Sequence, residues 1–335
     1  MSRRQPPPLP PREGLSPSRV RVPNRQPMTA YEVVLHAVLT QRHRHPDDGP
    51  NAVLQRFREH QVALRDVPQV HPDQMLDPGT DVWFYRKPAP EPELPFEAQV
   101  IYRDEYLTVV DKPPFMAVTP RGRHITQTLI VQQRRRTGNE ELSPAHRLDR
   151  LTSGLVVCTN HAEIRGQYQQ LFEQRRVSKV YHALAPYNAH IADQVSRCAS
   201  EGRDFQWSSR IKKRVGVLQA QTVEGPPNTV TRVLSVEPLS SPAVSGPSGR
   251  LGTLARYVLQ PLTGKTHQLR VHMAAAGVPI LNDPLYPAVL PDAPDNTAAP
   301  LALRAAKLGF VDPLTGEPRT FRAPAKPAYL SGLLD

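Results

Sequence analysis

The feature that most limits the fold is the irregular order of strand-like and helix-like segments after residue 96. Apolar runs of strand length occupy residues 107–110, 154–159, 180–185 and 254–262. Segments with helical spacing of apolar residues occupy 126–135, 162–173 and 266–276. Because helices and strands do not alternate regularly, the pattern argues against a doubly wound parallel sheet and predicts an α+β fold.

The composition of the chain changes along its length and predicts four parts. Residues 1–27 are rich in Pro and Arg with few periodic apolar residues, so we expect a disordered basic tail. Residues 28–86 have the pattern of two short helices followed by strands, which predicts either a small RNA-binding module or a plain N-terminal extension packed on the main domain. Residues 87–95 form a Pro-rich linker, and residues 96–335 form the main domain.

The charge of the chain favours a polyanionic partner. Lys and Arg number 42 against 31 Asp and Glu, which gives a formal net charge of +11. A surplus of this size favours nucleic acid, because each neutralised phosphate releases counterions. The chain has no apolar run long enough to span a bilayer and no secretory signal. With only two cysteines it has no disulfide framework, so we expect a cytoplasmic protein, and a monomer by default.

The most distinctive segment runs from His146 to Leu155 and places Asp149 between Arg147 and Arg150. It lies at a turn that leads into an apolar strand. A carboxylate flanked by cations is held ionised, which suits a nucleophile or an electrostatic stabiliser. Spacing alone leaves an ordinary surface ion pair as the alternative.

The string His-Arg-Leu-Asp-Arg-Leu-Thr-Ser-Gly at residues 146–154 closely resembles the catalytic signature of the RluA-type pseudouridine synthases. Other segments resemble motifs of that family in the family's order: Asp-Lys-Pro-Pro-Phe at 111–115, Lys-Val-Tyr at 179–181, Leu-Thr-Gly-Lys-Thr-His-Gln-Leu-Arg-Val-His-Met-Ala at 262–274, and Asp-Pro-Leu-Tyr at 283–286. The resemblance covers roughly residues 96–324.

This resemblance implies a catalytic domain with a mixed, largely antiparallel central sheet flanked by helices and loops, plus a small N-terminal α/β module. It implies isomerisation of uridine to pseudouridine in structured rRNA or tRNA on a base flipped out of the RNA. No cofactor and no metal is expected, because the reaction has no redox step and no group donor. The sequence also lacks a phosphate-binding glycine loop and a metal cluster.

The resemblance also implies roles for individual residues. Asp149 corresponds to the catalytic aspartate, and Tyr181 to the tyrosine that stacks on the base and accepts a proton. Arg270 corresponds to the basic residue that pairs with the aspartate, and Arg147 to the arginine that fills the gap left by the flipped base. Further substrate-binding residues are expected in the same motifs: His146, Arg150, Lys112, Lys265 and His267.

Two questions stay open at the level of sequence. Whether the carboxylate attacks the ribose, attacks the base or only deprotonates the ribose does not follow from the residues. The alternative function is a catalytically inactive RNA-binding protein or RNA chaperone, against which the joint presence of Asp149, Tyr181 and Arg270 argues. A methyltransferase or deaminase is disfavoured because a cofactor loop and a zinc signature are missing.

Overall fold

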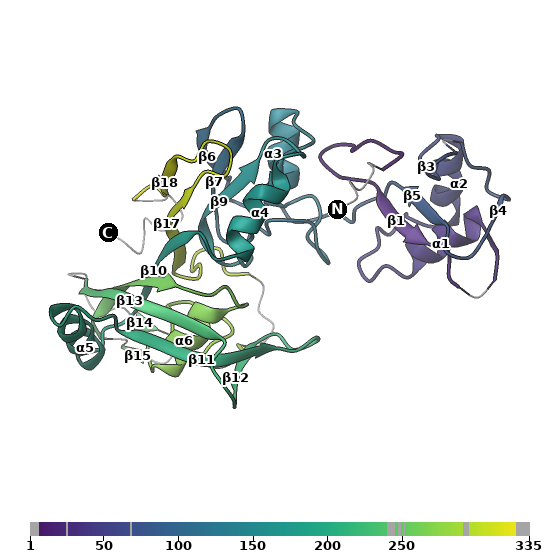
Figure 1. The fold of residues 1–335 in the computed structure, drawn as a ribbon. Helices are drawn as coiled ribbons and strands as arrows, with labels where there is room; N and C mark the ends of the chain where they lie inside the picture. Colours follow the sequence, from purple (N-terminus) through teal and green to yellow (C-terminus); the bar gives the residue numbers. More distant parts are fainter. Residues whose placement is uncertain are drawn as a thin grey trace. The chain divides into compact units, whose positions relative to one another are not determined.

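The computed structural model describes residues 7–24, 26–67, 69–239, 245–246, 249–250, 252–290 and 295–325 (Figure 1). The chain divides into two compact units. One unit comprises Met1–Glu93 and Thr119–Glu140, and the other comprises Leu94–Val118 and Glu141–Asp335. No helix within the described residues has the length and apolarity needed to cross a membrane.

The N-terminal unit is built from short elements around a small core. Its elements are β1 (Ser18–Arg21), β2 (Met28–Thr29), α1 (Ala30–Leu39), α2 (Pro50–Arg58), β3 (Val62–Ala63), β4 (Met75–Leu76), β5 (Asp81–Phe84) and α3 (Leu129–Thr137). Helix α1 begins at a capping box, in which Thr29 and Glu32 satisfy each other's backbone N–H groups. Its buried face, Val33, Val34 and Val38, belongs to one apolar cluster with residues of α2 and β5.

Residues 18–22 depart from the disordered tail that we expected. Strand β1 pairs antiparallel with β5, and Val22 is fully buried. The Pro and Arg content hides a short period-2 pattern in which Val20 and Val22 alternate with arginines, and the Arg21 guanidinium donates to Asp81 at 2.9 Å. Residues 1–6 and 25 of the predicted tail lie outside the described residues.

The second unit begins at Leu94, close to the predicted residue 96, but residues 119–140, which we expected in the main domain, group with the N-terminal residues. Local contacts explain the grouping. The Glu91 carboxylate accepts backbone N–H bonds from Ile125, Thr126 and Gln127 at 2.7–3.2 Å. At the end of this segment, the backbone N–H of Gly14 donates to Glu140.

The second unit is organised around an eleven-stranded sheet. Its strand order is β12-β11-β13-β16-β10-β17-β9-β7-β6, with β18 on β17 and β8 on β9. Among the described strand pairs, β17 and β9 alone run parallel, and the others are antiparallel. The mixed, largely antiparallel α+β fold is therefore confirmed.

The strands of this sheet are β6 (Gln99–Arg103), β7 (Leu107–Lys112), β8 (Ser143–Pro144), β9 (Ser153–Thr159), β10 (Ser178–Pro186), β11 (Gln206–Lys213), β12 (Ala220–Val223), β13 (Thr229–Pro238), β16 (Leu254–Pro261), β17 (Leu303–Val311) and β18 (Pro318–Arg322). The helices are α4 (Arg165–Glu173), α5 (Ala189–Ser200) and α6 (Gln268–Ala275), and a separate two-stranded ladder joins β14 (Ser245–Gly246) to β15 (Gly249–Arg250).

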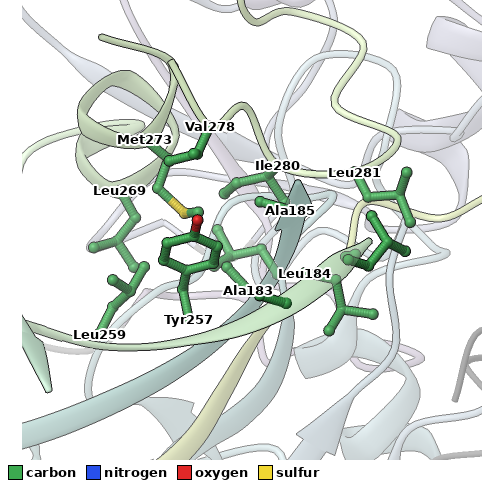
Figure 2. Close-up of a cluster of buried hydrophobic side chains, with 14 of the residues drawn as sticks. Ala183, Leu184, Ala185, Tyr257, Leu259, Leu269, Met273, Val278, Ile280 and Leu281 are labelled. Carbon is green, nitrogen blue, oxygen red and sulfur yellow. The ribbon is translucent and has the colours of Figure 1, made fainter. Parts of the chain in front are cut away.

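The core of this unit fixes α6 against the sheet. Figure 2 shows Leu269 and Met273 of α6 facing Tyr257 and Leu259 of β16, with Ala183 of β10 beside them. These side chains are almost completely buried. Burial of such apolar side chains stabilises by roughly 1.5–3 kcal/mol each. Because α6 and β10 share this core, the residues at the start of the helix are held near those on β10.

Candidate active site

A cavity of about 350 Å³ lies in the second unit where three of the predicted motifs meet. Its walls come from the 146–152 loop, from β10, and from the segment that enters α6. The predicted site residues that line it are His146, Arg147, Asp149, Tyr181, Lys265, His267 and Arg270. Lys112 and Arg150 are not among its lining residues.

Asp149 lies in the turn that precedes β9, and its side chain is 37% exposed. The backbone N–H of Thr152 closes the turn on the carbonyl of Asp149 at 3.1 Å. Gly154 follows with φ +107°, and a Cβ there would lie 2.3 Å from the backbone oxygen of Ala305. Only glycine permits this close approach of β9 to β17, so the motif glycine fixes the strand that carries the loop.

Neither arginine beside Asp149 in sequence pairs with it in space. Within the described residues, the group that faces its carboxylate within 4.0 Å is the imidazole of His267, whose Nε2 lies 4.0 Å from Oδ2. Arg150 instead forms two bonds to Asp295, at 2.6 and 2.7 Å. Arg147 is exposed at the cavity wall. The expected flanking ion pair is therefore not present around Asp149.

Tyr181 enters the cavity from β10, where the pairing with β17 shifts register between Val180 and Tyr181. Burial and the negative charge of Asp149 both raise the pKa of the Tyr181 phenol. The hydroxyl therefore keeps its proton at neutral pH. A neutral phenol can stack on a base and donate a hydrogen bond, whereas it is a weak proton acceptor.

Arg270 has a different partner from the one predicted. Its buried guanidinium donates to Asp283 through Nε at 2.8 Å and through Nη2 at 2.5 Å. Asp283 also accepts from the backbone N–H groups of Leu285 and Tyr286. The expected ion pair between Arg270 and Asp149 is wrong in this structure, because the Asp283 turn supplies a fully buried bidentate acceptor. Arg270 still lines the cavity.

Lys112 is fully buried and does not fit the expected contact with substrate. Its ammonium donates to the carbonyls of Pro113, Met116 and Arg150 at 2.7–3.1 Å. Burial lowers the pKa of Lys112 to about 7, against the opposing charge of Asp149. The side chain thus ties the loop after β7 to the residue that follows Asp149, which is a structural function.

His146 holds the other side of the same loop. Its Nε2 accepts the backbone N–H of Val157 at 3.2 Å, and its ring stacks on Phe172 with centroids 4.1 Å apart. Burial, together with the charge of Lys179, lowers the pKa of His146 to about 3, so the ring is neutral. Lys265 is exposed on the cavity wall.

Sequence reasoning missed one residue that lines this cavity and one that contacts a lining residue. Lys179 lines the cavity two residues before Tyr181, and burial lowers its pKa. The i, i+2 spacing on one strand was the available signal, because such residues share a face of the sheet. Tyr286 contacts His267, with its hydroxyl 3.0 Å from Nδ1. No metal-binding cluster of His, Cys, Asp and Glu occurs among the described residues.

Comparison with known proteins identifies this arrangement. The model of the RNA pseudouridylate synthase family matches residues 106–275, which include the 146–152 loop, Tyr181 and all of α6. This chain belongs to the RNA pseudouridylate synthase family. The match spans about half of the chain, and it confirms the RluA-type resemblance together with the relatives below.

The tRNA pseudouridine synthase C of Vibrio parahaemolyticus is 30% identical over 242 residues, covering 68% of this chain and 91% of that protein. The dual-specificity RNA pseudouridine synthase RluA of Salmonella typhi is 30% identical over 230 residues, covering 68% and 92%. Among solved structures, human RNA pseudouridylate synthase domain containing 1 superposes with a TM-score of 0.51 and 25% identity, covering 70% of this chain and 86% of that chain. The chain is accordingly an isomerase of RNA uridine.

Proposed function

We propose that this protein isomerises specific uridines in structured rRNA or tRNA, with Asp149 as the catalytic carboxylate and the target base flipped into the cavity. The observation that carries the proposal is the position of Asp149. Its partly exposed carboxylate faces a cavity of about 350 Å³ beside a neutral tyrosine. This volume is within the ~300–1,000 Å³ typical of ligand sites.

The charge around the cavity suits an RNA backbone. Arg147 and Lys265 are both exposed on its walls, and the chain carries a formal net charge of +11. Flipping a base costs a few kcal/mol of lost stacking and pairing. Phosphate contacts with these cations would offset that cost, and the Arg147 side chain can fill the space that the base leaves.

The chemistry needs only groups that the cavity contains. The N1–C1′ bond breaks, the uracil turns, and a C5–C1′ bond forms. Positive charge develops on the ribose while the first bond breaks, and the Asp149 carboxylate stabilises it either electrostatically or by direct attack. Tyr181 stacks on the uracil and donates its hydroxyl proton to a hydrogen bond. No cofactor enters this sequence of steps.

The test is tritium release from RNA labelled at C5 of uridine. We expect the wild-type protein to release tritium and Asp149→Asn to release none while it still binds the RNA. The two RNA pools are assayed separately, with tRNA first because one relative is named for it. Binding without release by the wild-type protein from either pool would favour the RNA-binding or chaperone alternative.

A further inference from the structure

The hydroxyl of Tyr286 fixes which nitrogen of His267 carries a proton. This hydroxyl accepts the backbone N–H of Ala220 at 2.7 Å and donates to the carbonyl of the same residue at 2.9 Å. The single proton of the hydroxyl is therefore donated to that carbonyl. The remaining contact, 3.0 Å to Nδ1 of His267, can form only if Nδ1–H donates to the hydroxyl oxygen. His267 is thus held as the Nδ1–H tautomer.

This tautomer turns the lone pair of Nε2 toward Asp149. Nε2 lies 4.0 Å from Oδ2, so in the resting state two acceptors face each other. No hydrogen bond can form between two acceptors until a proton or a donor comes between them. The pair is therefore arranged to take up one proton that neither group holds at rest.

The backbone conformation of His267 is strained. Its φ of +57° is in the left-handed region, directly before α6. That conformation costs a non-glycine residue roughly 1–2 kcal/mol. Such strain persists where surrounding contacts determine the conformation, as at functional sites. Here the Tyr286 bond and the edge-to-face packing of the two rings, with centroids 5.7 Å apart, supply those contacts.

We infer that His267 is the acceptor that relieves Asp149 of the proton taken from C5 of the uracil. The inference rests on the proposed function, and His267 acts through Asp149 without contacting the base. Once the C5–C1′ bond has formed, the C5–H bonding pair becomes the C5=C6 double bond. The N1=C6 π pair returns to N1, which takes a proton from water. The C5 proton passes to Asp149, then to Nε2, and then to water.

The charges that face His267 agree with this role. Burial is the main cause that lowers the pKa of His267, with Arg270 and Lys213 adding to it, while Asp149 and Asp283 oppose it. The Tyr286 hydroxyl, which contacts Nδ1 of His267, stays neutral, because burial raises its pKa to about 12. The imidazole is therefore unprotonated at neutral pH and free to accept. The side chain is 12% exposed, so it can pass the proton to water.

The test compares His267→Asn and His267→Gly with the wild-type protein by C5 tritium release and by pseudouridine formation. Asn and Gly both tolerate positive φ, so neither adds backbone strain. We expect His267→Asn to lower kcat by about 10²-fold or more, as loss of an acid–base group does, with KM unchanged. Wild-type kcat falls as the pH drops through the pKa of His267, which gives the pH–rate profile an acidic limb. This limb disappears in the variant. Added imidazole restores activity to His267→Gly.

A purely structural role would give different results. The kcat of His267→Asn would fall while its pH–rate profile kept the acidic limb, and imidazole would not restore activity to His267→Gly. Either result overturns the inference. An unchanged kcat in His267→Asn would overturn it as well, while tritium release by the wild-type protein would leave the proposed function intact. Absence of release from the wild-type protein in both RNA pools would overturn the proposed function and this inference together.

Discussion

The observed pair of Arg270 with Asp283 and the expected pair of Arg270 with Asp149 predict different effects of mutation on stability. Both side chains of the pair are almost completely buried, at 2% and 0% exposed. Removing one partner of a buried, bidentate pair leaves an uncompensated charge and costs about 3–5 kcal/mol. We therefore expect Asp283→Asn to lower the free energy of unfolding by that amount. The loss includes weaker acceptance of the N–H groups of Leu285 and Tyr286.

The assay is urea unfolding of four proteins that form a double-mutant cycle: wild type, Arg270→Met, Asp283→Asn and the double variant. Contacting residues show coupling energies of about 0.5–3 kcal/mol, so the double variant should be less destabilised than the sum of the single variants. Asp149→Asn is the matched control, because its side chain is 37% exposed and makes no ion pair with Arg270 within 4.0 Å.

We expect the control to change the unfolding free energy by less than about 1 kcal/mol. Comparable destabilisation by Asp149→Asn and Asp283→Asn, or additive effects of Arg270→Met and Asp283→Asn, would refute the reasoning. The same cycle measured for kcat separates stability from catalysis. Asp149→Asn should abolish turnover in a fully folded protein.

Three further predictions follow from single contacts. Gly154→Ala should lower the free energy of unfolding, measured in urea, by about 2–5 kcal/mol, because it adds positive-φ strain and a backbone clash with Ala305. Gly138→Ala is the control: its Cβ would meet open space, so it should show the strain alone. Burial lowers the pKa of His272 to about 4, so the unfolded chain binds more protons below pH 6.5. Stability should then fall as the pH drops from 6.5 toward 4, and less steeply in His272→Gln; an equal slope would contradict the assignment. Arg147→Gln and Lys265→Gln should each reduce the slope of log binding constant against log salt by roughly 0.7–0.9, as removal of one phosphate contact does, while Asp149→Asn leaves the slope unchanged.

Periodicity was enough to predict the fold class, because strands such as β9 contain continuous apolar runs and α6 has helical spacing. It failed at β1, where arginines alternate with the buried face and the composition resembles that of a disordered tail. The positions of side chains within a motif were less predictable. Lys112 and His146 lie in recognisable motifs, yet their hydrogen bonds go to backbone groups that are set only by the tertiary fold.

The environment of Asp149 shows why local sequence could not predict its partners. In a turn, the side chains of successive residues point to different sides of the chain. Arg150 can therefore reach Asp295 while Asp149 faces the cavity. The groups that do meet the carboxylate come from β10 and from the start of α6, more than thirty and more than a hundred residues later in the chain. A carboxylate locked in a strong local ion pair stays ionised, but its compensated charge makes it a weaker base. Because Arg150 pairs with Asp295 and Arg270 pairs with Asp283, the fold leaves Asp149 beside a histidine lone pair and a neutral phenol. Under the proposed function, this environment lets the carboxylate interact with the ribose and pass on a proton.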